Sequence, residues 1–219
     1  MANILVTGGN RGIGLAICRQ LHDRGDRVYA TTRQESGALA DTGVNIIDGI
    51  DVTSDASVAL LAKSMSGIQI DVLLNSAGIL TRETIDDLDF DRIRNQFEVN
   101  ALGPLRVTRA LRDNLVTGSR VGIITSRVGS IEDNGSGGIY GYRMSKAAAN
   151  MAGKNLSHDL APRGIAVVLL HPGLVATEMT GGNGITPSDA ARGIIQRLDD
   201  LTLENSGTFW HAEGYQLPW

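Results

Sequence analysis

The chain has 219 residues, a formal net charge of −4 and a single cysteine, Cys18. A chain of this length can bury a core without disulfide bridges, so the lone cysteine excludes a disulfide-rich secreted scaffold. The acidic balance and the 4% aromatic content argue against a nucleic-acid or anionic-membrane partner.

The N-terminal apolar run, Ile4–Val6, is too short for a signal peptide and follows no cationic stretch. No segment approaches the roughly 18 apolar residues of a membrane span. We therefore expect a cytoplasmic protein with no membrane partner.

Short apolar runs alternate with longer helical patterns along the whole chain. The apolar runs predict strands at Asn3–Thr7, Arg27–Thr31, Asn45–Ile50, Asp71–Asn75, Arg120–Thr125 and Ile165–His171. The intervening patterns predict helices at Gly12–Arg24, Ser54–Met65, Asp89–Leu115 and Tyr142–Ala161. A last helix opens at Pro187, and Phe209–Trp210 forms a final short strand.

This alternation predicts one α/β domain over residues 1–219. Its fold is a Rossmann-type, doubly wound parallel β-sheet with helices on both faces. In such a sheet, ligands bind outside the carboxyl ends of the strands, so the residues that follow strands are the candidates for a site.

The first strand runs into a glycine-rich loop that opens a helix. The loop, residues 7–14, reads Thr7-Gly8-Gly9-Asn10-Arg11-Gly12-Ile13-Gly14. Glycines here let backbone N–H groups and the positive helix end approach a pyrophosphate. Because the spacing alone also occurs by chance, the position between strand and helix carries the prediction of dinucleotide binding; a plain tight turn is the alternative.

The second strand is followed by Thr31-Thr32-Arg33, with no carboxylate placed to accept bonds from a ribose 2′-hydroxyl. Arg11 and Arg33 could instead pair with a 2′-phosphate through charge-assisted hydrogen bonds. This pattern favours NADP(H), with NAD(H) possible, whereas ordinary solvated arginines are the other interpretation.

A tyrosine and a lysine, Tyr142 and Lys146, lie four residues apart at the start of a predicted helix and so share one face. A cation near the phenol would favour its ionised form and bring its pKa toward the working range. Ser126 follows a strand and can bond a carbonyl or alcohol oxygen. Asn100 lies in the predicted long helix, where asparagine is unfavourable.

Together these motifs resemble the short-chain dehydrogenase/reductase family over nearly the whole chain. The resemblance implies Asn100, Ser126, Tyr142 and Lys146 as catalytic residues. With the loop pattern, the resemblance implies that the cofactor-binding positions are Thr7, Gly8, Asn10, Arg11, Gly12, Ile13, Gly14, Arg33, Asp51, Val52, Asn75, Ala77, Gly78, Tyr142, Lys146, Pro172, Gly173, Val175 and Thr177. In Asn75-Ser76-Ala77-Gly78, Ser76 replaces the second asparagine of the family's N-N-A-G motif.

The resemblance implies hydride transfer between a nicotinamide and a small carbonyl compound or secondary alcohol. Tyr142 would exchange the proton and Ser126 would hold the oxygen. Lys146 would lower the pKa of Tyr142 and hold the nicotinamide ribose, and Asn100 would support a water chain.

The segments Thr202–Gly207 and Leu217–Trp219 further resemble C-factor-like and sniffer-type carbonyl reductases. The alternative is a dinucleotide-binding regulatory or signalling protein of the C-factor type, with little or no turnover. The intact set of Ser126, Tyr142 and Lys146 argues for an enzyme, because a sensor needs no positioned acid–base group.

Other reactive residue types receive structural interpretations. We expect Cys18 to be a buried small hydrophobe, His171 to be structural, and His22, His158 and His211 to lie at the surface or an interface. Because no H-E-x-x-H or C-x-x-C spacing is present, we predict no metal site.

Two further expectations concern assembly and access. The helices Asp89–Leu115 and Tyr142–Ala161 carry more apolar and small side chains than one sheet contact needs, and family members commonly pair through them, so we expect a homodimer or homotetramer. Residues 174–186 are short and glycine-rich; by the resemblance they form a substrate lid over an open pocket.

Overall fold

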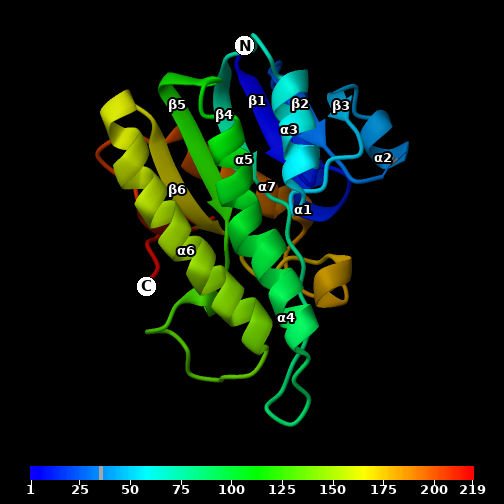
Figure 1. Cartoon of the computed structure of the whole chain (residues 1–219), viewed down its shortest axis with the longest axis vertical. Coiled ribbons are helices and arrows are strands. Elements are labelled where there is room, and N and C mark those ends of the chain that lie inside the picture. Colours follow the sequence, from blue (N-terminus) through cyan, green and yellow to red (C-terminus); the bar gives the residue numbers. More distant parts are fainter. Residues whose placement is uncertain (35–36) are drawn as a thin grey trace.

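The computed structural model describes residues 1–34 and 37–219. Seven parallel strands form one sheet in the order β3-β2-β1-β4-β5-β6-β7 (Figure 1). They are β1 (Asn3–Thr7), β2 (Arg27–Thr31), β3 (Asn45–Ile47), β4 (Ile70–Asn75), β5 (Leu115–Ile124), β6 (Ala166–His171) and β7 (Thr208–His211). Strand order reverses between β1 and β4, which pair directly, so their carboxyl ends border the expected ligand crevice.

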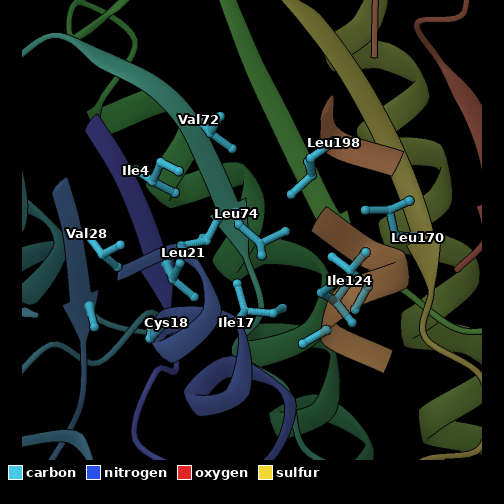
Figure 2. Close-up of a cluster of buried hydrophobic side chains, with 14 of the residues drawn as sticks. Ile4, Ile17, Cys18, Leu21, Val28, Val72, Leu74, Ile124, Leu170 and Leu198 are labelled. Atoms are coloured by element: carbon cyan, nitrogen blue, oxygen red, sulfur yellow. The ribbon is translucent and has the colours of Figure 1, made fainter. Parts of the chain in front are cut away.

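Helices cover both faces of the sheet, as the alternating pattern predicts. They are α1 (Gly12–Asp23), α2 (Gly37–Ala40), α3 (Asp55–Ser64), α4 (Phe90–Phe97), α5 (Gly103–Ala110), α6 (Tyr140–Leu160) and α7 (Pro187–Asp199). One core packs α1 and α7 against the sheet, and a second core packs α3, α5 and α6 against the opposite face. Figure 2 shows the first core, where Ile17 and Leu21 of α1 meet Ile4 and Leu74 of the sheet.

Local sequence fixes several helix starts. Ser54 accepts a hydrogen bond from Ser57 N at the start of α3, and Asp89 accepts from Asp91 N and Arg92 N at the start of α4. Thr186 caps α7 through Asp189 N, and Pro187 occupies its first turn. These are the side-chain types that satisfy the unpaired N–H groups of a first turn.

The single helix predicted over Asp89–Leu115 is wrong. The structure has α4, a π-helical turn (Glu98–Leu102), α5, and then β5 from Leu115. The π turn forms where the Asn100 side chain bonds the backbone of Ile79 and where Gly103 packs against Val52. Both partners lie far away in the sequence, so apolar spacing could not reveal the interruption.

The predicted strand over Arg120–Thr125 begins five residues earlier, at Leu115. A register shift interrupts the pairing of β4 with β5, and Ser119 bridges it by accepting from Val116 N and donating to the carbonyl of Ile70. The polar run Thr117-Gly118-Ser119 therefore belongs to an irregular strand rather than to a loop.

The C-terminal segment packs beside the sheet. The backbone oxygen of Trp219 accepts from Ser130 Oγ at 2.8 Å, Ile131 N at 2.8 Å and Glu132 N at 3.0 Å. The Trp219 ring stacks on Phe209, with 5.7 Å between ring centroids. Residue 219 thus holds the loop that follows Ser126. None of the helices in the described ranges combines the length and apolarity that a membrane span requires.

Candidate active site

The glycine loop and the loop after β4 are tied together at the crevice. Thr7 Oγ1 accepts from Ser76 N at 3.0 Å and from Ala77 N at 3.2 Å. Gly8 has φ +69°, and a Cβ there would lie 2.9 Å from the Cα of Ala77. Thr7 therefore joins two strand ends rather than pointing its hydroxyl away from the protein, and only glycine fits at position 8.

The remaining glycines leave a concave backbone at the start of α1. A Cβ on Gly14 would overlap the carbonyl oxygen of Gly8, and Gly12 has φ +55° with the Thr177 methyl group next to it. Arg11, at the N-cap position of α1, makes no side-chain cap. Backbone N–H groups at the positive end of a helix are thus available to an anion, which fits the pyrophosphate of a dinucleotide.

The two arginines considered for a 2′-phosphate both lie exposed beside this loop. Arg11 forms an ion pair with Glu178, and both side chains are largely solvent-accessible. Arg33 follows β2 and acts electrostatically on Asp51. The pKa of Asp51 lies below its usual range, mainly because Thr53 N donates to the carboxylate at 2.9 Å, with Arg33 and Arg106 adding to the effect.

Tyr142, on α6, and Ser126, which follows β5, lie close enough for the Ser126 side chain to act on the Tyr142 phenol. Ser126 is buried and caps the short 3-10 turn Arg127–Gly129. Burial raises the pKa of the Tyr142 phenol to about 12, and Ser126 acts in the opposite direction. The protein's own groups therefore keep this phenol protonated at neutral pH, whereas the sequence suggested a lowered pKa.

Lys146 lies close to the phenol ring but bonds elsewhere. Its Nζ is 5.6 Å from the centroid of the Tyr142 ring and donates to the carbonyl oxygen of Ile124 at 2.8 Å. The side chain is 3% exposed, and this burial lowers its pKa to about 8. A Cβ on Gly78 would lie 3.6 Å from Nζ, so the loop after β4 reaches the same spot.

Asn100 links the π turn to two parts of the site. Its Oδ1 accepts from Ile79 N at 2.9 Å, and its Nδ2 donates to the Ile79 carbonyl at 2.9 Å and to Ser145 Oγ at 3.0 Å. Asn100 thus fixes the loop after β4 against the first two turns of α6, where Tyr142 and Lys146 lie.

Several other predicted cofactor residues turn their side chains toward the protein interior. Asn75 Nδ2 donates to Thr108 Oγ1 of α5 at 3.3 Å, and Val52 is buried beneath Gly103. Pro172 and Val175 are also buried. Contact between these residues and a dinucleotide would have to come from their backbones.

The two ends of the segment 174–186 are hydrogen-bonded to each other through their backbones. Ala176 N donates to the Ile185 carbonyl at 2.8 Å, and Ile185 N donates to the Leu174 carbonyl at 2.9 Å. Thr177 and Thr180 form a reciprocal capping box at the turn between them. Together with the Arg11–Glu178 ion pair, these bonds set the segment against the glycine loop.

Two predictions about isolated residues have opposite outcomes. Cys18 is confirmed as a buried side chain, and burial raises the pKa of its thiol to about 12. The placement of His211 at a surface or interface is wrong, because it is 7% exposed and packs edge-on against His171 at 4.9 Å between ring centroids. Burial, reinforced by His211 and Arg127, lowers the pKa of His171 to about 3.

The site also contains residues that the sequence did not single out: Glu83, Gln96 and Gly141. Glu83 lies in a polar stretch without a motif, and no spacing links it to the helix that it contacts. Across residues 1–34 and 37–219, no group of three or more His, Cys, Asp or Glu side chains could hold a metal ion.

Known proteins resemble this chain both in sequence and in fold. Residues 2–186 match the family described as short chain dehydrogenase. The chain is 48% identical, over the full length of both proteins, to 1-hydroxy-2-glutathionyl-2-methyl-3-butene dehydrogenase of Rhodococcus sp. strain AD45. It is 46% identical to C-signal of Myxococcus xanthus, covering 68% of this chain and 93% of that protein.

Two solved structures superpose on the whole chain. The NADPH-bound carbonyl reductase from chicken fatty liver has a TM-score of 0.90 at 30% identity, covering 100% of this chain and 99% of the other. The carbonyl reductase Sniffer of D. melanogaster has a TM-score of 0.92 at 29% identity, with 100% of both chains covered.

Proposed function

Because the chain belongs to the short-chain dehydrogenase family and is an oxidoreductase acting on small molecules, we propose that it transfers a hydride between NADP(H) and a carbonyl compound or secondary alcohol. The observation that carries the proposal is the proximity of Ser126 to the Tyr142 phenol, with Lys146 Nζ 5.6 Å from the centroid of the phenol ring. This group lies beyond the carboxyl end of β5, on the same edge of the sheet as the glycine loop. A bound nicotinamide would supply or accept the hydride.

The proton chemistry follows from the two perturbed side chains. With a pKa of about 12, Tyr142 carries its proton at neutral pH and can give it to the oxygen of a carbonyl that is being reduced. Ser126, next to Tyr142, would hold the same oxygen. In the oxidative direction the phenol must first ionise, and a charged Lys146 beside the ring would stabilise that form.

The proposed cofactor positions are loop 7–14 for the pyrophosphate, with Gly78, Lys146 and Thr177 farther along the same edge. Arg11 and Arg33 support a preference for NADP(H), and so does the bound NADPH named for the chicken relative. In titrations followed by fluorescence, we expect NADPH to bind more tightly than NADH. Equal or tighter binding of NADH would refute the preference.

Replacement of Tyr142 by phenylalanine tests the chemistry. We expect Tyr142→Phe to lower turnover by on the order of 10² or more, because the proton donor is removed while the ring remains. Turnover is followed at 340 nm with NADPH and a panel of carbonyl compounds, and with NADP⁺ and alcohols. The panel includes a 1-hydroxy-2-glutathionyl compound because a relative is named for one.

The same variant provides the control, because it keeps the glycine loop, Lys146 and the aromatic ring and should therefore still bind NADPH. Normal turnover by Tyr142→Phe on a confirmed substrate would contradict the mechanism. The similarity to C-signal suggests an alternative, a regulatory dinucleotide-binding protein. A protein of that kind would bind the cofactor but turn over no compound in the panel.

A further inference from the structure

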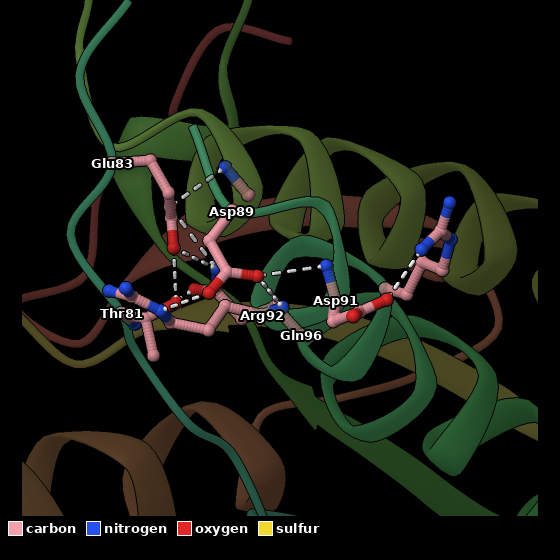
Figure 3. Close-up of polar contacts among 8 residues, drawn as sticks. Thr81, Glu83, Asp89, Asp91, Arg92 and Gln96 are labelled. Carbon is pink, nitrogen blue, oxygen red and sulfur yellow. Dashed lines mark hydrogen bonds and ion pairs between the residues drawn. The ribbon is translucent and has the colours of Figure 1, made fainter. Parts of the chain in front are cut away.

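A buried carboxylate, Glu83, lies against the helix that carries Tyr142 and Lys146. It is 1% exposed, yet no lysine or arginine lies within ion-pair distance of it among the described residues. Its oxygens accept from Thr81 Oγ1, from Gln96 Nε2 at 3.3 Å and from Gly141 N at 3.3 Å. Figure 3 shows Thr81, Glu83 and Gln96 turned toward one another between the loop after β4 and α4.

Every partner of Glu83 in this cluster is a hydrogen-bond donor. A carboxylate is an acceptor only, so its oxygens match a hydroxyl, an amide NH₂ and a backbone N–H. The amide of Gln96 is itself fixed, since its Oε1 accepts from Thr81 N at 3.0 Å and the side chain is 0% exposed. Because the Gln96 oxygen is occupied by Thr81 N, the Gln96 NH₂ group must face Glu83.

The helix α6 starts without a side-chain cap of its own. Its N-cap residue, Ile139, cannot accept a hydrogen bond through its side chain and has φ +40°. It is the one non-glycine residue with positive φ among those described, and this conformation is costly for a β-branched side chain. Something other than local sequence must hold the start of α6.

Glu83 supplies the missing contact. In most helices, the N-cap side chain accepts from the N–H group of the second or third helical residue. Gly141 is the second residue of α6, and its N–H donates to Glu83, which lies 58 positions earlier in the chain. The negative charge also lies at the positive end of a 21-residue helix, where it is stabilising.

Close packing transmits this contact to the active site. A Cβ on Gly141 would overlap Gln96 Nε2 and would lie 3.1 Å from the Cα of Ile93, so α6 rests directly on α4 at this point. Tyr142 is the next residue, and its phenol lies beside Ser126. A shift of the first turn of α6 would change the position of the phenol relative to Ser126.

We propose that Glu83 is a positioning residue for Tyr142: it replaces the N-cap of α6 and, with Gln96, sets where the first turn of that helix lies. This inference rests on the proposed hydride-transfer function. It predicts that loss of the carboxylate lowers kcat with little change in cofactor affinity, because the glycine loop lies on a different element and Lys146 lies beyond the first turn of α6.

The test compares Glu83→Ala with a matched loss of a helix cap. We expect Glu83→Ala to lower kcat by about tenfold or more, because small displacements of reacting groups are costly, with the Kd for NADPH changed less than about twofold. Asp89→Ala removes the N-cap of neighbouring α4, a contact of the same kind, and should leave kcat near the wild-type value.

An exchange of the two buried partners tests the network itself. Glu83→Gln alone places an amide NH₂ group against the N–H donors of Gln96 and Gly141. Because two donors then face each other, we expect this variant to lower kcat. The double variant Glu83→Gln with Gln96→Glu restores matching donors and acceptors and should recover kcat to within about threefold of the wild type. A wild-type kcat in Glu83→Ala, an equal loss in Asp89→Ala, or no recovery in a folded double variant would each overturn the proposal.

Amide hydrogen exchange at Gly141 separates this proposal from the proposed function. Glu83→Ala should speed exchange at Gly141 by about tenfold or more relative to both the wild type and Asp89→Ala. If the wild type turns over no compound in the panel, the proposed function fails, and exchange still decides the positioning role. Unchanged exchange at Gly141 would overturn the role of Glu83 whether or not turnover is found.

Discussion

Lys146 is proposed to serve the site as a charged amine, but burying that charge lowers the stability of the fold. Its ammonium is buried with one carbonyl partner, and burial lowers its pKa from 10.5 to about 8. Below pH 8 the amine is charged in both the folded and the unfolded chain, so the folded state bears the full cost of burying the charge. Between about pH 8 and 10.5 the folded chain binds fewer protons than the unfolded chain, and this cost falls as the pH rises.

We therefore expect the wild type to gain about 3 kcal/mol of unfolding free energy relative to Lys146→Met between pH 7 and pH 10.5. Urea unfolding of both proteins at the two pH values measures the difference. Lys63→Met, which replaces an exposed lysine on α3, should track the wild type. A constant difference between wild type and Lys146→Met would show that the amine is not buried in its charged form.

Residue types at strand ends could be predicted from the sequence, but the direction of their side chains could not. Ser126 and Tyr142 come together as expected, since both lie at one edge of a parallel sheet. Asn75 lies at the same edge, yet its amide bonds Thr108 beneath the crevice. The pKa of Tyr142 also differs from the expected one, because burial raises it while the Lys146 ammonium donates to the Ile124 carbonyl.

At the scale of elements, a strand or helix was predictable where its own residues determine it. The ranges of β1 and β2 agree with the prediction, and α1 and α3 agree to within two residues at each end. The π turn and the early start of β5 depend on partners elsewhere, such as Ile79 for Asn100. Glu83 was missed for the same reason, since its partner Gly141 belongs to a distant helix.

The glycine loop and α1 are in close contact at Gly14, so a larger residue at this position should disturb both elements. Gly14→Ala would push a Cβ into the carbonyl oxygen of Gly8, so the helix must move away from the loop. We expect a loss of about 1–3 kcal/mol of unfolding free energy and a weaker NADPH complex, measured by thermal unfolding and by fluorescence titration.

Gly135→Ala serves as the matched control, because a Cβ there meets nothing within 4 Å and the backbone is not in the left-handed region. It should leave both stability and NADPH affinity at the wild-type level. If Gly14→Ala behaves like Gly135→Ala, the cradle formed by residues 7–14 is looser than its contacts indicate.

At the scale of the whole molecule, the face formed by α5 and α6 carries exposed apolar side chains, and a hollow lies between the C-terminal ends of the two helices. Leu102, Leu105, Met144 and Met151 are all partly exposed around α5 and α6. A hollow of about 620 Å³ between these helices is lined by residues that include Arg112, Leu156 and Arg163. Such a face suits the pairing of two copies of this chain that the sequence suggests.

We propose a homodimer or homotetramer formed through this face and predict that Met151→Asp shifts it toward monomer at micromolar concentration. A charge placed against a second copy must be desolvated, whereas Met151 is 64% exposed in the single chain. Light scattering and sedimentation measure the shift. Leu60→Asp, at a similarly exposed apolar position on α3, should not change the assembly; a monomeric wild type would refute the proposal.

The bonds between Trp219 and the loop after Ser126 have a consequence for biosynthesis. Ser130 and Trp219 are 89 positions apart, so the loop cannot be tethered while the ribosome tunnel still encloses the segment around residue 219. A nascent chain can complete β1 and the glycine loop much earlier. The dinucleotide cradle is therefore available to form during translation, whereas the reactive hydroxyl gains its final support only after residue 219 has left the tunnel.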